Sequence, residues 1–365
     1  MARLFRRSRL RRRVNLCSMQ SINWKGASMA AVLDASASID IPVIDIGPFL
    51  AGDPRGTRDV VEQVQRACES IGFLVVRGHG VPTALVDQLY SQSRAFFDLP
   101  AAAKLAVEKP AGTEFRGYSP QGVKTIGKDR DEKLRPSLHE SFAIGPLDSR
   151  GASTRPNLWP QQPTGLRTEL TAYYHEMERL ARAILSIFAD ALEVPRSYFL
   201  DRIGQHNSIL RVMHYPALER APQAGEERAA AHTDTTAITI LRIDDAPGGL
   251  QVQRPDGSWI DVVKVPDTFI VNIGDIMMRW TNDRFVSTMH RVANPPSDVA
   301  ARASRMSVPY FCMPDEDAVI ECIPSCAGEG AKYPPITSGA LLSNRYTKVY
   351  SVGEGSHPGI GRTSS

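Results

Sequence analysis

The strongest constraint on the fold is the stretch 208–313, where short runs of β-branched and aromatic residues alternate with turn signals. Several short strands at this spacing are typical of an all-β barrel or sandwich. Asp256-Gly257 predicts a tight hairpin turn between two of them. No repeat with a period of about 20 to 50 residues is apparent, which disfavours a propeller or a solenoid. The expected strands cover 210–215, 237–243, 250–253, 259–263, 269–273, 277–280 and 306–311.

The residues before this stretch combine helical patterns with a few short strands. Apolar residues recur at three- and four-residue steps, with the clearest stripe over 165–192 and further helices expected at 57–71 and 83–97. Residues 103–163 form a long excursion rich in glycine, proline and charge. Short strands are expected at 41–45, 71–76, 117–118 and 141–144. The sequence therefore predicts a mainly β fold with flanking helices.

Within the strand-rich region, His232-Thr-Asp234 and the more distant His290 suggest a metal site. Side chains two positions apart on an extended segment point the same way, so His232 and Asp234 can bind one ion together. A histidine from a later strand would complete one face of an octahedron. Two imidazoles and one carboxylate make the facial triad of non-haem iron(II) oxygenases, which leaves open positions for a cosubstrate and O₂.

Arg305-Met-Ser307 follows His290 by 15 residues on the next expected strand. Alternation directs Arg305 and Ser307 to the same face, where an arginine fork and a hydroxyl suit a carboxylate. Tyr215, on another expected strand, is a plausible additional donor. The sequence thus predicts a site for the far carboxylate of a dicarboxylate that chelates iron through its 2-oxo acid end.

These motifs resemble the isopenicillin N synthase-like family of 2-oxoglutarate/iron(II) dioxygenases. The resemblance covers about 300 residues and leaves out the first residues and the last ones. One departure is Met213-His214 before Tyr215, where plant members of the family usually carry Asn-Tyr. The matching segments are Ile41-Pro-Val-Ile-Asp45, Gly72-Phe-Leu-Val-Val-Arg-Gly-His-Gly80, Arg116-Gly-Tyr118, Glu140-Ser-Phe142, Tyr215-Pro216, Ala231-His-Thr-Asp234, Gly249-Leu-Gln-Val252, Val271-Asn-Ile-Gly-Asp275, Trp280-Thr-Asn282, His290-Arg-Val292 and Arg305-Met-Ser-Val-Pro309.

The resemblance implies a double-stranded β-helix, or jelly roll, with helices packed on one side. It implies a reaction in which 2-oxoglutarate and O₂ give succinate and CO₂ while a small organic molecule is hydroxylated, desaturated or cyclised. Ascorbate would stimulate such an enzyme. The implied site residues agree with those found above: His232, Asp234 and His290 for Fe(II), and Arg305, Ser307 and Tyr215 for 2-oxoglutarate.

Two alternatives remain open at the level of sequence. An oxidase of the same fold that does without 2-oxoglutarate, as isopenicillin N synthase does, could use Arg305 and Ser307 for its own substrate. A non-catalytic protein could bind nucleic acid through the first 28 residues, which contain seven Arg and Lys25 and no acidic residue. Omitting 2-oxoglutarate from an assay would separate the first alternative from the main prediction.

The rest of the composition is typical of an ordinary globular protein. The basic segment, within a leader expected to be disordered over 1–38, supplies eight positive charges, so the remaining chain is net negative despite an overall charge of +3. We expect an N-terminal region over 39–200, a jelly-roll core over 201–350 and a tail over 351–365. The absence of a long apolar run or secretory signal favours a cytoplasmic protein without membrane contact, either monomeric or weakly homo-oligomeric.

Cysteines and the remaining histidines receive weaker interpretations. Five scattered cysteines favour reduced thiols, and Cys322 and Cys326 lack the further ligands of a zinc site. His79, between two glycines, is expected to be a turn residue bonded to the backbone. His214 could lie in the pocket or have a structural role. The substrate pocket is expected from residues 112–142, including Tyr118 and His139, and from the segment after Pro314.

Overall fold

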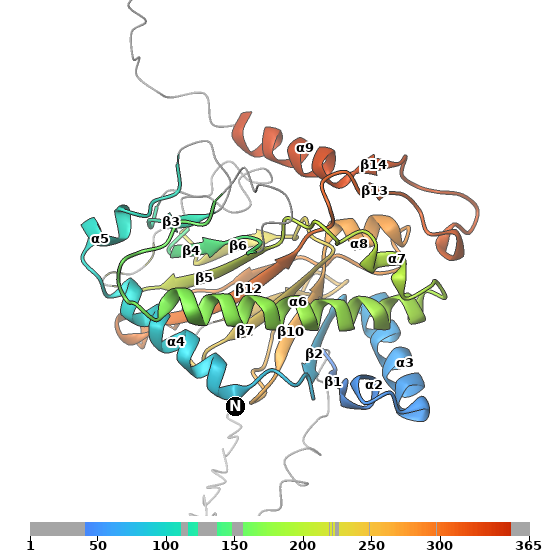
Figure 1. Cartoon of the computed structure of the whole chain (residues 1–365), viewed down its shortest axis with the longest axis horizontal. Helices are drawn as coiled ribbons and strands as arrows, with labels where there is room; N and C mark the ends of the chain where they lie inside the picture. Colours follow the sequence, from blue (N-terminus) through green and yellow to red (C-terminus); the bar gives the residue numbers. More distant parts are fainter. Residues whose placement is uncertain are drawn as a thin grey trace, which may run out of the picture. The chain divides into compact units, whose positions relative to one another are not determined.

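An eight-stranded sheet and a four-stranded sheet form the frame of the computed structural model (Figure 1). The structure describes residues 41–110, 116–122, 137–147, 156–218, 220, 222, 226–247, 249–296 and 298–351, so the predicted leader lies outside the described residues. Within the described residues, the larger sheet has the order β1 (Val43–Asp45), β2 (Phe73–Arg77), β10 (Phe269–Ile273), β7 (Ile238–Ile243), β12 (Arg305–Cys312), β5 (Ile209–Tyr215), β4 (Glu140–Ile144) and β3 (Gly117–Ser119).

The smaller sheet is formed by four short strands, of which one ends at His232 and another begins at His290. Its order is β6 (Ala229–His232), β11 (His290–Val292), β8 (Leu250–Gln253) and β9 (Trp259–Asp261), and β11 pairs with β6 through His290 and His232. A separate hairpin of β13 (Val319–Ile320) and β14 (Ile336–Thr337) lies near the C-terminus. Strands from the predicted N-terminal region and from the predicted core region share the larger sheet.

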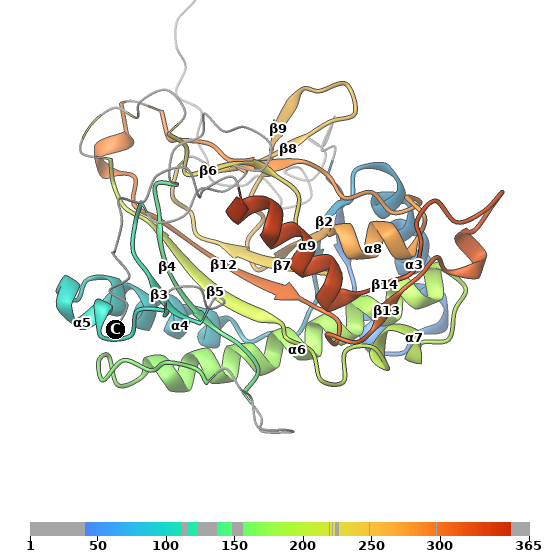
Figure 2. The same cartoon turned by 90° about the horizontal axis from the view of Figure 1, so that it is seen from above.

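Helices cover one face of the larger sheet, as Figures 1 and 2 show. The helix α6 (Leu166–Ala191) buries Tyr173, Met177 and Ile184 in the same core cluster as strand residues of β7, β10 and β12. Burial of each such side chain contributes about 1.5–3 kcal/mol, so this stripe fixes the helix to the sheet. The other helices are α2 (Gly47–Leu50), α3 (Pro54–Ser70), α4 (Thr83–Phe97), α5 (Ala101–Leu105), α7 (Ser197–Leu200), α8 (Asp275–Trp280) and α9 (Ser338–Ser351).

The opposite face of the larger sheet is turned toward the smaller sheet and carries the polar residues of the site. Alternation along β12 puts Met306 and Val308 in the helix-side core, so Arg305 and Ser307 point to the inner face. In the register of the sheet, Arg305 lies opposite Tyr215 on β5. The larger sheet therefore presents one row of residues suited to bind an anion.

The predicted helices agree closely with the structure, whereas one predicted strand is wrong. Residues 277–280 belong to the helix α8, whose buried residues Ile276, Met277 and Trp280 have helical spacing. A four-residue run with three apolar side chains does not distinguish a strand from a short buried helix. The short strands β6 and β11 were not among the predicted strands.

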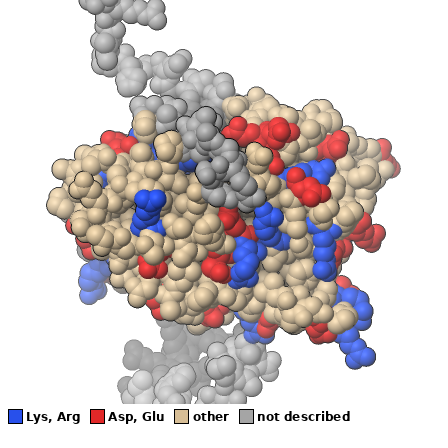
Figure 3. All heavy atoms as spheres, viewed as in Figure 1, with Lys and Arg blue, Asp and Glu red and all other residues tan. Residues whose placement is uncertain are grey.

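The described surface carries both signs of charge. On the face drawn in Figure 3, lysine and arginine side chains alternate with aspartate and glutamate. Among the described residues, no helix is both long enough and apolar enough to cross a membrane.

Candidate active site

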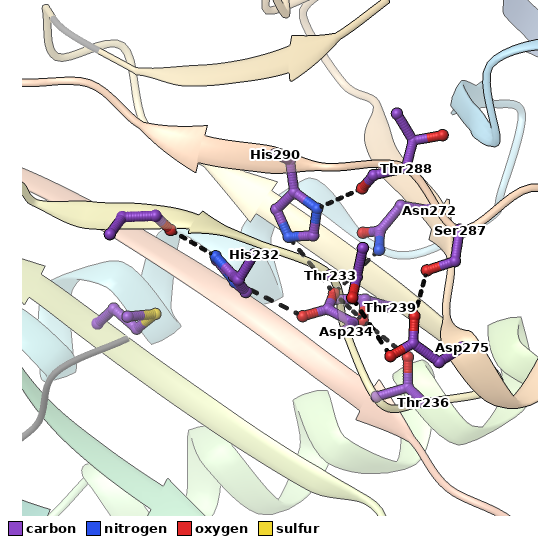
Figure 4. A network of polar contacts seen from close by, with 12 residues as sticks. His232, Thr233, Asp234, Thr236, Thr239, Asn272, Asp275, Ser287, Thr288 and His290 are labelled. Atoms are coloured by element: carbon purple, nitrogen blue, oxygen red, sulfur yellow. Dashed lines mark hydrogen bonds and ion pairs between the residues drawn. The ribbon is translucent and has the colours of Figure 1, made fainter. Parts of the chain in front are cut away.

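His232, Asp234 and His290 meet between the two sheets, as the sequence predicts (Figure 4). Within the described residues they are the one group of three His, Cys, Asp or Glu side chains that could hold a metal ion, and their ligand atoms lie within 4.8 Å of one another. The Nε2 atoms of His232 and His290 lie 3.8 and 3.7 Å from the Asp234 carboxylate oxygens. This set of two nitrogens and one oxygen is the donor set that suits Fe(II).

The second nitrogen of each imidazole is already bound to the backbone. His232 Nδ1 donates to the carbonyl of Ala230 at 2.7 Å, and His290 Nδ1 donates to the carbonyl of Thr288 at 3.0 Å. Such bonds fix the tautomer and the ring orientation of a metal-binding histidine. Both Nε2 atoms are therefore left to point toward Asp234 and a shared ion.

The Asp234 carboxylate is held in the same way through one of its oxygens. Oδ2 accepts hydrogen bonds from Thr239 Oγ1 at 2.7 Å and from Asn272 Nδ2 at 2.9 Å. These donors come from the neighbouring strands β7 and β10, and their bonds leave Oδ1 for a ligand. The site is thus oriented by fixed neighbours before any ion binds.

The charge states of His232 and Asp234 are those of metal ligands. Burial, together with the neighbouring His290, lowers the pKa of His232 to about 3, so its imidazole is neutral near pH 7. Burial alone would raise the pKa of Asp234, but the two imidazoles and the hydrogen bonds from Asn272 and Thr239 lower it. A neutral imidazole and an ionised carboxylate are the forms that bind a cation.

The loop that carries Asp234 lies against the start of α8. Asp275 donates its backbone N–H to the carbonyl of Asp234 at 2.7 Å. A Cβ atom on Gly274 would lie 2.1 Å from the carbonyl oxygen of Thr236, so this approach requires glycine. The segment Asn272-Ile-Gly-Asp275 thus supports the loop in several ways, although the sequence analysis gave these residues no role.

The predicted carboxylate site is buried and contains a donor without a partner. Arg305, Ser307 and Tyr215 are each at most 2% exposed. The Nη1 atom of Arg305 has no hydrogen-bond partner among the described residues. Because an unpaired buried donor is costly, this geometry fits a carboxylate that binds there.

Arg228 is a second buried cation in this region that the sequence analysis missed. Its guanidinium lies 5.7 Å from the centre of the Tyr215 ring, and that of Arg305 lies 5.0 Å from the same ring. Burial and the positive charge of Arg305 lower the pKa of Arg228 to about 10. Two cations in one buried region favour an anion between the sheets. The sequence signal was a lone arginine beside the small residues Ala229 and Ala230.

Three other residues singled out in the sequence have structural contacts. His79 is bonded to the backbone of Asp267 and Val81, as predicted. His214 points to the helix side, where Nδ1 donates to Glu140 at 2.8 Å, so its role is structural. Tyr118 also points to the helix side and donates to Glu140 at 2.6 Å, so its expected place in the pocket is wrong.

A hollow opens on the inner side of β3, β4 and β5, beside the strand residues expected to form the substrate pocket. Gly117 and Ser119, on either side of Tyr118 in β3, face the opposite way from Tyr118. Together with His139 they line this hollow. Ser141 pairs with Met213, which also pairs with Ser307, so the hollow shares the sheet face of the carboxylate site. Residues 112–115 and 123–136 of the expected pocket lie outside the described residues.

Comparison with known proteins decides the family. A family model for the N-terminal part of "non-haem dioxygenase in morphine synthesis" matches residues 41–162, and that of the 2OG-Fe(II) oxygenase superfamily matches residues 206–314. The chain is 32% identical over 323 residues to the 2-oxoglutarate-Fe(II) type oxidoreductase hxnY of Emericella nidulans, covering 86% of this chain and 91% of that protein. The chain belongs to the 2-oxoglutarate/Fe(II) oxygenase superfamily.

Other relatives support the same family assignment for this oxygenase. The proline hydroxylase buaE of Petromyces alliaceus is 32% identical over 306 residues, covering 81% of this chain and 94% of its own. The crystal structure of a full-length Neurospora crassa protein in complex with alpha-ketoglutarate superimposes with a TM-score of 0.75 at 32% identity, covering 84% of this chain and 95% of the Neurospora chain.

These comparisons confirm the predicted jelly roll and reaction class. The protein is a 2-oxoglutarate-dependent dioxygenase, an oxidoreductase that uses Fe(II) and acts on a small molecule. The alternatives of an oxidase without 2-oxoglutarate and of a non-catalytic protein are not favoured.

Proposed function

We propose that this oxygenase hydroxylates a small organic acceptor, with desaturation or ring closure as other outcomes of the same C–H oxidation. The observation that carries the proposal is the buried group of two imidazoles and one carboxylate between the sheets. The proposed ligands are His232, Asp234 and His290 for Fe(II), and Arg305, Ser307 and Tyr215 for 2-oxoglutarate.

The protein residues would bind and orient the reactants. When bound, Fe(II) and 2-oxoglutarate supply the oxidant from O₂, and 2-oxoglutarate leaves as succinate and CO₂. The unpaired Nη1 of Arg305 supports a charge-assisted contact to the far carboxylate, and the charge of Arg228 favours an anion nearby. Position then decides which C–H bond of the acceptor reacts.

The hollow on β3, β4 and β5 supports an acceptor that carries anionic or hydrogen-bond-accepting groups. Lys109 and Arg211 lie on its wall, and burial and then the charge of Arg211 lower the pKa of Lys109, an effect that a bound anion would offset. Ser119, Ser141 and His139 add polar groups to the same wall. A cationic and hydroxyl-lined wall favours carboxylates or carbonyl-rich compounds over hydrocarbons.

Several further expectations stand as proposals. We propose that the enzyme is monomeric or weakly homo-oligomeric and works in the cytoplasm. We also propose that ascorbate stimulates turnover, and that neither nucleic acid nor a membrane takes part in catalysis. The proposed domains are the leader over 1–38, the N-terminal region over 39–200, the core over 201–350 and the tail over 351–365.

A succinate-release screen with Fe(II), ascorbate and 2-oxoglutarate tests the proposed function. Small carboxylic acids are compared with their matched amides, and acids are expected to give more acceptor-dependent succinate. His290→Ala provides the control, since a triad reduced to two ligands should neither bind Fe(II) tightly nor release succinate. Full activity of His290→Ala would disprove the proposed iron site, whereas equal turnover of acids and amides would disprove only the acceptor class.

A further inference from the structure

The C-terminal helix α9 reaches the loop between two of the proposed iron ligands through one side chain, Arg345. Its Nη2 atom donates to the backbone carbonyl of Thr233 at 3.0 Å, and Nη1 lies 3.5 Å from the Thr233 hydroxyl. Nη1 also donates to the carboxylate of Asp275, which forms an ion pair with it. Thr233 lies between His232 and Asp234, so Arg345 contacts the backbone that spaces these ligands.

Asp275 connects this contact to both ligand-bearing segments (Figure 4). Its backbone N–H donates to the carbonyl of Asp234, and Oδ2 accepts from the Thr233 hydroxyl at 3.2 Å. Its other oxygen, Oδ1, accepts from the Ser287 hydroxyl at 2.7 Å. Ser287 lies three residues before His290, on the segment whose Thr288 carbonyl holds the His290 ring.

The contact is partly shielded from water and joins opposite charges. The side chains of Arg345 and Asp275 are 23% and 19% exposed. Among the described residues, this is the one ion pair recorded for Asp275, whose other partners are neutral hydroxyls. A charge-assisted bond in such a setting is stronger than a neutral one. Loss of the guanidinium would leave a partly buried carboxylate beside the ligand loop with hydroxyl partners alone.

Near its start, α9 is held by apolar contacts of two leucines. Leu341 and Leu342 pack against the helix-side core, and the first turn of α9 follows β14. In Figures 1 and 2, α9 lies along the side of the fold where α8 begins. The helix thus has an apolar attachment to the core and a separate polar attachment to the ligand loop.

We propose that Arg345 is a positioning residue for the iron site, which fixes the loop between His232 and Asp234 through Thr233 and Asp275. This inference rests on the proposed function, because it requires iron at His232, Asp234 and His290. Groups that orient metal ligands typically change metal affinity by about 10- to 100-fold when they are removed. A role confined to attaching α9 would instead change stability without changing metal affinity.

The test compares Arg345→Gln and Arg345→Lys with the wild type by titration of Mn(II), a redox-inert probe, into the full chain. The matched control is Arg284→Gln, which removes a similar partly exposed arginine–carboxylate pair, with Glu69, away from the ligand loop. We expect Mn(II) binding about ten-fold weaker for Arg345→Gln and intermediate for Arg345→Lys, with wild-type affinity for Arg284→Gln. Amide hydrogen exchange at Thr233 should rise in Arg345→Gln, while the melting temperature of the metal-free protein stays near the wild-type value.

Two results would overturn the role of Arg345 and leave the proposed iron site standing. The first is wild-type Mn(II) affinity in Arg345→Gln. The second is weaker Mn(II) binding by Arg345→Gln that merely parallels a lower melting temperature of its metal-free form. His290→Ala is titrated in the same experiment. Wild-type Mn(II) affinity in His290→Ala would disprove the proposed iron site and, with it, the role of Arg345.

Discussion

At the scale of single residues, each side chain of the site already forms a hydrogen bond through a polar atom that does not face the proposed ion. Each imidazole uses Nδ1 for a backbone carbonyl, and Asp234 uses Oδ2 for Thr239 and Asn272. The remaining atoms, Nε2 of each imidazole and Oδ1 of Asp234, already lie close together without any rotation of the side chains. The protein therefore loses little conformational freedom when an ion binds.

Arg305→Lys is predicted to raise the 2-oxoglutarate concentration for half-saturation while iron affinity stays unchanged. Lysine keeps the charge but cannot offer two parallel donors to one carboxylate. Losing such a contact costs on the order of 1.5 to 3 kcal/mol, or roughly ten- to a hundred-fold in apparent affinity. Ser307→Ala should have a smaller effect. Titration of 2-oxoglutarate under saturating Fe(II) provides the measurement.

The matched control for this prediction is Arg242→Lys. Arg242 is buried on the same sheet but faces the helix side, where it donates to the carbonyl of Thr268. Its replacement can lower stability without changing half-saturation. If Arg305→Lys also left half-saturation unchanged, Arg305 would not bind 2-oxoglutarate.

The grouping of the three proposed ligands could be predicted from sequence, whereas the contacts that orient these side chains could not. His232 and Asp234 are two positions apart, and the chemistry of the set identifies His290 as the third member. Arg345 and Asp275 contact Thr233 across 112 and 42 residues of chain. No local period links positions so far apart, and an arginine on a C-terminal helix looks like an ordinary solvent-exposed charge.

At the scale of elements, a buried ionic group joins the edge of the larger sheet to α5. Glu140 on β4 accepts hydrogen bonds from His214 on β5, from Tyr118 on β3 and from Lys104 on α5. Burial alone would raise the pKa of Glu140, but these three donors lower it to about 2. Its charged form therefore stabilises the fold.

Glu140→Gln is predicted to lower the free energy of unfolding at pH 7 by about 2–4 kcal/mol, since it leaves Lys104 partly buried without a charged partner. The folded pKa of Glu140 lies below its ordinary value of 4.5, so this contribution is present above pH 4.5 and lost as the pH falls toward 2. The difference in the free energy of unfolding between Glu140→Gln and the wild type should therefore become smaller as the pH falls from 4.5 toward 2. Urea unfolding at pH 7 and pH 3 measures it.

Glu176→Gln is the matched control for Glu140→Gln. Glu176 pairs with Arg179 on the exposed side of α6, where an ion pair contributes at most about 0.5 kcal/mol. Equal destabilisation by the two substitutions would show that the group around Glu140 has no special role.

Element boundaries were predicted well where periodicity was long and poorly where it was short. The helix α4 (Thr83–Phe97) has the predicted bounds, and α6 differs from its prediction by one residue at each end. Residues 277–280 form a helix because Ile276, Met277 and Trp280 face the core together. The helical spacing is visible in the sequence only if the residues before Met277 are considered together with 277–280.

At the scale of the whole molecule, the two sheets bring together residues from distant parts of the chain. The proposed ligand His232 ends β6 in the smaller sheet, while Asn272 and Thr239, which hold Asp234, come from the larger sheet. The candidate metal site therefore forms only when the sheets face each other. The jelly roll was predictable through the resemblance of the motifs, since strand patterns alone allowed either a barrel or a sandwich.

The last prediction concerns the basic segment at the start of the chain. Deleting residues 1–28 is expected to leave turnover and half-saturation for 2-oxoglutarate within about two-fold of the full chain, because the family match and the described residues both begin at residue 41. The deletion removes seven Arg and Lys25, so it should abolish any salt-sensitive binding to DNA. A full-length variant with the seven arginines replaced by glutamine separates the effect of charge from that of length. Steady-state kinetics and DNA binding at low and high salt provide the measurements. A large loss of turnover in the purified truncated protein would show that this segment contributes to the active site.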